Sequence, residues 1–186
     1  MPKSSMASST PTSRSCCSTP RANVNVSALQ LDGNLPDQVL AALQRHGLEP
    51  ARISIEITES ALMKDPESAK TVLQQLRDVG VELAIDDFGT GYSSLAYLRH
   101  LPVDCLKVDR SFVAELSDGH AEIASAVIAL ARNLNLCTVA EGVETVQQAE
   151  ELTRLGANYL QGFNLAQPMT GGHTAAWFAA HSEDDA

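Results

Sequence analysis

From residue 22 onward, short apolar runs alternate with longer stretches in which apolar residues recur every three or four positions. The short runs predict β-strands, and in several of them apolar and polar residues alternate, as between Ile53 and Thr58. Six segments have this character, at residues 23–27, 52–58, 82–86, 105–109, 137–141 and 158–161.

The longer stretches predict helices over residues 36–46, 66–79, 93–100, 120–134, 145–155 and 174–181. Proline opens two of them at Pro36 and Pro66, and glycine closes the same two at Gly47 and Gly80. Strands that alternate with helices imply a parallel sheet with right-handed crossovers. We therefore expect an α/β fold, an incomplete TIM-like barrel with about six of the eight strand–helix units, its parallel strands inside and its helices outside.

The alternation within each strand separates an outer face from an inner one. In the strand at 52–58 the isoleucines occupy the face that would pack on helices, which points Glu56 into the barrel. The same alternation turns a polar side chain inward near the end of four other strands, namely Asn25, Asp86, Lys107 and Gln161. The orientation of Glu141 stays open, because Val139 shares its face.

Acidic clusters recur at the ends of three apolar runs, at residues 56–59, 86–89 and 141–144. The carboxyl ends of parallel strands meet at one rim of a barrel, so these carboxylates are expected to converge there. Hard divalent cations prefer oxygen ligands of this kind. The pattern therefore predicts a cation site and metal-assisted chemistry.

Both ends of the chain differ from its body. Residues 1–21 contain ten serines and threonines, three prolines and no acidic residue, a composition that predicts a disordered tail. Residues 182–186 are predicted to form a solvated acidic tail. Residues 22–181 are then one barrel domain.

The net charge of −10 argues against two classes of partner, and all 23 acidic residues follow Arg21. Such a surface repels phosphate backbones, so we expect no general binding of DNA, RNA or anionic membranes. No apolar run approaches the length of a membrane span. The cysteines Cys16, Cys17, Cys105 and Cys137 form no Cys-x-x-Cys pattern, which favours a reducing, cytoplasmic location with Cys105 and Cys137 packed as small apolar residues.

Several sequence blocks, taken together and in order, carry a family resemblance. The blocks are VNVS at 24–27, EITE at 56–59, DDFGTGYSSL at 86–95, LKVDRSFV at 106–113, AEGVET at 140–145 and QG at 161–162. From about residue 22 to residue 168 the chain resembles the EAL domain, the cyclic di-GMP phosphodiesterase module of bacteria. The resemblance implies a TIM-like barrel that hydrolyses cyclic di-GMP to linear pGpG with Mg²⁺ or Mn²⁺ at a two-metal site. It also implies a possible homodimer.

The resemblance implies a role for each matching residue. The metal ligands would be Asn25, Glu56, Asp86 and Asp87. The catalytic residues would be Lys107, Glu141 and Gln161. Glu59 would stabilise the lid that follows Asp87, and the substrate-binding residues would be Glu144, Gly89, Thr90 and Gly91.

The chain departs from the family before residue 22. The Glu-Ala-Leu that names the family occurs nowhere in the sequence, and its glutamate is a metal ligand in the family. Without that strand and its neighbours, we expect an opening in the barrel wall, with sheet edges near Asn25 and Gln161 and impaired hydrolysis.

Three interpretations remain open at this point. The chain is a fragment of a phosphodiesterase whose chemistry is intact only in the parent protein. Alternatively, it is an inactive module that binds cyclic di-GMP or a protein partner. The third is an unrelated barrel in which Lys107 forms a Schiff base, although the acidic neighbours would raise the pKa of that lysine when the chemistry needs it lowered.

Overall fold

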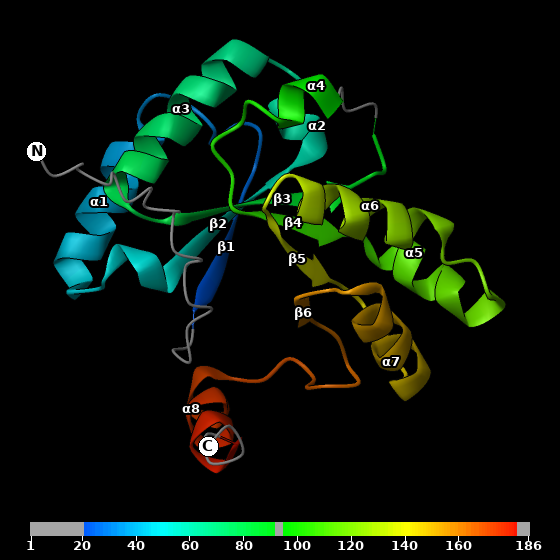
Figure 1. Cartoon of the computed structure of the whole chain (residues 1–186). Helices are drawn as coiled ribbons and strands as arrows, with labels where there is room; N and C mark the ends of the chain where they lie inside the picture. The colour runs from blue at the N-terminus through cyan, green and yellow to red at the C-terminus, as the bar shows by residue number, and fades with distance from the viewer. Residues whose placement is uncertain (1–20, 92–94, 182–186) are drawn as a thin grey trace, which may run out of the picture.

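Figure 1 shows the computed structural model of the chain, which describes residues 21–91 and 95–181. The predicted tail at 182–186, and all of the predicted tail at 1–21 except Arg21, lie outside the described residues. The guanidinium of Arg21 pairs with the carboxylate of Glu82 at the start of a strand.

One parallel sheet of six strands runs through the described residues in the order β1-β2-β3-β4-β5-β6 (Figure 1). The strands are β1 Ala22–Val26, β2 Ile53–Thr58, β3 Glu82–Phe88, β4 Cys105–Val108, β5 Cys137–Ala140 and β6 Tyr159–Leu160. The sheet curls into a half-barrel, as the pattern of alternating strands and helices predicted, and each strand ends within two residues of its predicted position.

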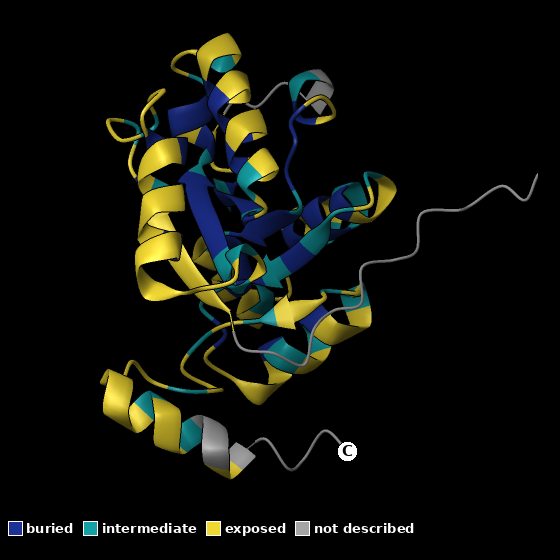
Figure 2. Cartoon of the chain, turned by 90° about the vertical axis from the view of Figure 1, so that its left-hand side faces the viewer, coloured by how far each residue is buried: buried dark blue, intermediate teal, exposed yellow. Residues whose placement is uncertain are grey.

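The outer face of the sheet forms the main core. Ile55 and Ile57 on β2, with Leu106 on β4, are almost fully buried and pack with the helices that cover this face. The helical partners include Leu73 and Leu76 of α3 (Pro66–Val79) and Ile128 of α6 (Glu122–Asn133). Figure 2 shows the result, with buried strands behind helices whose outward surfaces are exposed.

Local sequence signals set the ends of the longer helices. The carboxylate of Asp65 accepts a hydrogen bond from the amide of Ser68 at the start of α3, and Gly80 ends the helix in the left-handed conformation. Three other predicted helices are also present, as α1 (Leu35–His46), α6 and α7 (Val146–Leu155). The C-terminal helix α8 (Gly171–His181) begins earlier than predicted, and Figures 1 and 2 both place it apart from the other helices.

Several short elements were not predicted. The helices α2 (Glu59–Leu62) and α5 (Arg110–Glu115) directly follow β2 and β4. Two 3₁₀ turns, η1 (Pro50–Arg52) and η2 (Leu116–Asp118), are equally short. The helix predicted at 93–100 is described only as α4 (Leu95–Leu98), because residues 92–94 lie outside the described residues.

The two edges of the described sheet are β1 and β6, which is where the sequence placed them. Strand β1 is exposed along its length except at Val26, and Val24 is 43% exposed. Across the described ranges, none of the helices combines the length and apolar character that a membrane crossing requires.

Candidate metal centre

Lys107 lies at the centre of three carboxylates. Its Nζ donates to Oε2 of Glu56 at 2.7 Å, and it lies 3.1 Å from Oδ1 of Asp86 and 2.5 Å from Oε1 of Glu141. The side chains of Lys107 and Glu56 are only 3% and 4% exposed. Charged groups this deep in a protein persist when they are paired, so these four side chains form one electrostatic unit.

The sheet accounts for this convergence. Glu56 on β2, Asp86 on β3 and Lys107 on β4 come from three adjacent strands, and Glu141 follows the last residue of β5. The backbone amide of Glu141 donates to the carbonyl of Val108 at 3.1 Å, which continues the β4–β5 pairing by one residue. Side chains on one face of parallel neighbours point the same way, so alternation places all four on the inner face.

A bulge in β3 brings a further carboxylate into the group. The β3–β4 register shifts between Ile85 and Phe88, and Asp87 has a φ of 52°. Bulges of this kind redirect a side chain next to functional sites. One oxygen each from Asp86, Asp87 and Glu141 lies within 4.8 Å of the others.

These three carboxylates could hold a metal ion. An oxygen-only, acidic donor set suits a hard divalent cation such as Mg²⁺ or Mn²⁺ rather than a softer metal. The positive charge of Lys107 already balances part of the acidic charge in the same place. A cation bound here would therefore share the carboxylates with this ammonium group.

Burial and neighbouring charges set the protonation of the group. Desolvation favours neutral Lys107, but hydrogen bonds and charge from Glu141 and Glu56 outweigh it and raise the pKa of the lysine. Desolvation also raises the pKa of Glu141, against the opposing effect of Lys107. Lys107 is thus held as a cation and Glu141 binds a proton more readily than an exposed glutamate does.

Sequence reasoning missed Asp109 as a neighbour of this centre. Burial raises the pKa of Asp87, with further contributions from the charge of Asp86 and from the charge of Asp109 and a hydrogen bond to it. For Asp109, hydrogen bonds from Ser111 outweigh desolvation and lower the pKa. The signal was present in the sequence, since Asp109 lies two positions after Lys107 and so shares its face.

Glu59 holds the loop of Gly89, Thr90 and Gly91 that follows the bulge. It begins α2, is 2% exposed, and its Oε2 accepts a hydrogen bond from the Gly89 amide at 2.9 Å. A Cβ atom at position 91 would lie 2.5 Å from Oε1 of Glu59, so a larger residue there would displace the carboxylate that holds the loop. The hydroxyl of Thr90 donates to the carbonyl of Asp87 at 2.8 Å, which fastens the loop to the bulge.

Glu144 lies in the loop between β5 and α7, and its side chain is exposed. Its backbone amide donates to Oε1 of Gln148 at 2.8 Å. Gln148 is buried, and its Nε2 lies 3.3 Å from the carbonyl of Val113 and 3.2 Å from Oγ of Ser117. The loop that carries Glu141 and Glu144 is therefore tied to α5 and η2 through one glutamine.

Asn25 and Gln161 lie at opposite edges of the described sheet and both are exposed. Asn25 is the register partner of Glu56, so it lies beside the centre on the same face. Gln161 lines a hollow of about 370 Å³ together with Phe163 and Trp177. The ion-pair unit around Lys107 includes neither of these two amide side chains.

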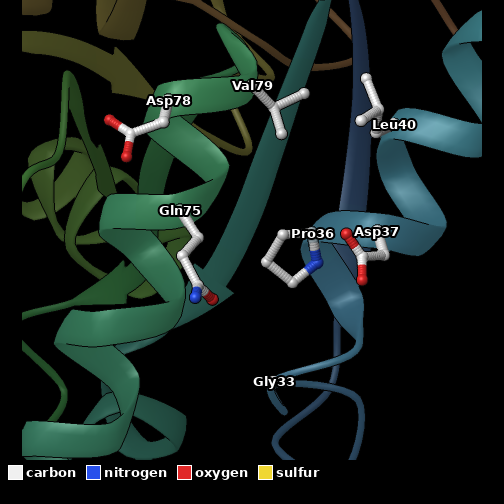
Figure 3. A pocket seen from close by; sticks show the side chains of 7 residues that line it. All are labelled: Gly33, Pro36, Asp37, Leu40, Gln75, Asp78 and Val79. Carbon is white, nitrogen blue, oxygen red and sulfur yellow. The ribbon is translucent and has the colours of Figure 1, made fainter.

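A larger groove, of about 440 Å³, lies away from the metal centre between α1 and α3 (Figure 3). Its lining residues are Gly33, Pro36, Asp37, Leu40, Gln75, Asp78 and Val79. None of the carboxylates around Lys107 lines it. The centre is thus defined by its charged side chains rather than by this groove.

The sequence model of the EAL domain matches residues 8–168. The chain belongs to the EAL domain family. Membership of this family sets aside the interpretation as an unrelated Schiff-base barrel. The match also reaches into the Ser/Thr-rich segment that precedes the described residues.

Two relatives from Pseudomonas aeruginosa are similar over most of the chain. The bifunctional diguanylate cyclase/cyclic di-GMP phosphodiesterase MucR is 54% identical over 78% of this chain and 22% of its own length. The cyclic di-GMP phosphodiesterase NbdA is 47% identical over 80% of this chain and 19% of its own length. The chain thus spans about a fifth of the length of these curated relatives.

Solved structures agree with the described fold. A cyclic di-GMP complex of the MucR phosphodiesterase superposes with a TM-score of 0.80 at 52% identity, covering 83% of this chain and 64% of that one. The EAL domain of P. aeruginosa FimX bound to cyclic di-GMP gives 0.74 at 29% identity, over 80% and 60% of the two chains. Both of these structures are complexes with cyclic di-GMP.

Proposed function

We propose that this EAL domain hydrolyses cyclic di-GMP to linear pGpG with the help of Mg²⁺ or Mn²⁺. The proposal rests on the carboxylates of Glu56, Asp86 and Glu141 around Lys107. The carboxylates can hold a metal cation, and this cation and the ammonium group of Lys107 can together balance the negative phosphates of a cyclic dinucleotide. The names of MucR and NbdA, both phosphodiesterases for this molecule, support it.

Asp86, Asp87 and Glu141 would hold the cation, with Glu56 and Asn25 beside them on the inner face. A divalent cation in such a site lowers the pKa of bound water and neutralises charge on a phosphoryl group. The chain's own residues are then left with the tasks of positioning the substrate and handling protons.

Lys107 is suited to bind phosphate rather than to remove a proton. Its raised pKa keeps Nζ charged, and an ammonium group can donate to a phosphoryl oxygen. Glu141, whose Oε1 lies beside Nζ of Lys107, is the better candidate for the general base that would take up a proton from an attacking water. The loop held by Glu59 would cover the reacting groups, and Gln161 would contribute from the far edge of the sheet.

Binding of cyclic di-GMP without hydrolysis is the second candidate. The sequence contains no Glu-Ala-Leu, whose glutamate was expected from the resemblance to be a metal ligand. The FimX structure, an EAL domain bound to cyclic di-GMP, supports this candidate. The two candidates share the substrate but differ in whether a bond is broken.

One experiment separates them. The purified chain is incubated with cyclic di-GMP and Mn²⁺, pGpG is measured by chromatography, and binding is measured by calorimetry. Hydrolysis predicts pGpG that disappears with EDTA and in Asp86→Asn, while Asp78→Asn on the exposed side of α3 stays active. Binding without product would support the second candidate. The absence of both product and binding would contradict both candidates.

A further inference from the structure

Two thiols lie side by side on the inner face of the sheet. Cys105 on β4 and Cys137 on β5 are register partners in adjacent parallel strands. Such partners have Cα atoms about 4.8 Å apart and side chains on the same face. Disulfide-bonded residues have Cα atoms about 4.4–6.8 Å apart, so the backbone already holds this pair within reach of a bond.

The two thiols differ in exposure. Cys105 is 3% exposed, and its Sγ lies 3.7 Å from the carbonyl of Leu106. Burial raises the pKa of Cys105, and the neighbouring Cys137 adds to the rise, which also indicates that the two side chains are close. Cys137 is only half-buried. A small oxidant in solution therefore reaches Cys137 first, because Cys105 is buried.

We propose that Cys105 and Cys137 form a redox-modification site that hydrogen peroxide converts to an intramolecular disulfide. The Cys137 thiolate attacks one peroxide oxygen, the O–O bond breaks, and the departing hydroxide takes up a proton as water. The sulfur of Cys105 then loses its proton and attacks the sulfenic sulfur of Cys137, whose hydroxyl leaves as the second water. Two thiols lose two electrons, and peroxide is reduced to two waters.

Proximity compensates for the weak acidity of Cys105. A buried thiol with a raised pKa is a poor nucleophile toward molecules in solution. Its partner sulfur is held on the adjacent strand, so the second step is intramolecular and needs little thiolate. Reversibility fits the pair as well, because disulfides in reducing compartments are usually transient.

The position of the pair connects it to the metal centre. Cys105 lies two residues before Lys107 on the same face, and Cys137 lies two residues before Val139, which is the register partner of Lys107. The bond would therefore join β4 to β5 one layer beneath the contact between Lys107 and Glu141. The site itself does not depend on whether the chain hydrolyses a cyclic dinucleotide.

Peptide mapping tests the proposal. The full chain carrying Cys16→Ser and Cys17→Ser is treated with hydrogen peroxide and digested with trypsin without reductant. Cleavage at the flanking lysine and arginine residues places the two remaining cysteines in peptides 100–107 and 133–154. We expect mass spectrometry to find these peptides joined, with two thiols lost per chain, and dithiothreitol to separate them.

Two comparisons make the result decisive. In the same background, Cys137→Ser should give no joined peptide and should leave the Cys105 thiol intact after peroxide. The proposal is overturned if Cys137 proceeds to sulfinic acid, or bonds to a second chain, while Cys105 remains a thiol. It is also overturned if the joined peptide forms no faster in the folded chain than in the same chain unfolded by urea.

Discussion

The charge of Lys107 balances the carboxylates of the metal centre. Three carboxylates lie within 2.5–3.1 Å of its Nζ, and the side chain is 3% exposed. Removing one member of a buried ion-pair network leaves the other charges without compensation. The effect on stability should therefore be much larger than that of an exposed lysine.

For Lys107→Met we expect the free energy of unfolding in divalent-free buffer to fall by about 3–5 kcal/mol. Urea unfolding followed by circular dichroism measures the change. The matched control is Lys70→Met on the exposed side of α3, which should change stability by about 0.5 kcal/mol or less. Equal effects in the two variants would contradict the assignment, and added Mn²⁺ should restore part of the loss only at position 107.

Asp87 offers a pH-dependent test. Burial, and then the charges of Asp86 and Asp109, raise its pKa in the folded chain. The folded state therefore holds the Asp87 proton more tightly than the unfolded state, whose aspartate pKa is about 3.9. Ionisation of Asp87 accordingly costs stability as the pH rises from that value through the folded pKa, and the cost is constant above it.

Asp87→Asn should thus be more stable than the parent chain at about pH 7 in the presence of EDTA, by an amount that shrinks toward about pH 4. Asparagine tolerates the positive φ of this position, so the substitution should not strain the backbone. Urea unfolding at several pH values gives the difference in free energy. A difference that does not vary with pH would show that the charge of Asp87 is not responsible.

At the scale of elements, Gln148 joins α7 to α5 and η2. Its Oε1 accepts hydrogen bonds from the amides of Glu144 and Thr145 at 2.8 and 3.1 Å, and its amide group donates toward Val113 and Ser117. The hydroxyl of Thr145 accepts a hydrogen bond from the backbone amide of Gln148 at 3.2 Å, which completes a capping box. One side chain therefore fixes both the start of a helix and the loop after β5.

Gln148→Met keeps the approximate shape but removes the acceptor for the backbone amides of Glu144 and Thr145 and the donor to Val113 and Ser117. We expect the free energy of unfolding to fall by about 1–3 kcal/mol. Gln147→Met, at the exposed neighbouring position, is the control and should be nearly neutral. If both variants unfold at the same urea concentration as the parent chain, the hydrogen bonds of Gln148 do not contribute to stability.

The elements also show what a sequence pattern can predict. The strands and their faces follow from a repeat of two, so the inward direction of Glu56, Asp86 and Lys107 was predictable before any coordinates. Short helices such as α2 and α5 carry too few residues for a periodic signal. The bulge at Asp87 depends on how β3 pairs with β4, which strand alternation alone does not encode.

The candidate site was predicted in outline rather than in detail. Alternation indicated that carboxylates would converge, and family resemblance assigned roles to individual positions. Acidic neighbours of Lys107 were expected, but neither signal indicated that three carboxylates would lie within 2.5–3.1 Å of its Nζ. The roles assigned to the individual site residues, including Asn25 and Gln161, remain predictions.

At the scale of the whole molecule, the half-barrel presents two strand edges in the described residues. Exposed edges present backbone groups that can pair with another chain, and lysine at an edge opposes this pairing. We expect the chain to self-associate with increasing concentration and Val24→Lys on β1 to weaken the association. Sedimentation velocity measures both, with Leu29→Lys in the loop after β1 as the control. A monomer at every concentration would contradict the prediction.

The sequential strand order has a consequence for how the protein is made. Each strand pairs only with its neighbours in chain order, so the sheet can grow strand by strand as the ribosome delivers the chain. Glu56 and Asp86 arrive first and repel each other until β4 supplies an ammonium group. Lys107 precedes Glu141 in the chain, so the fourth strand can offset this repulsion before the fifth strand adds its carboxylate.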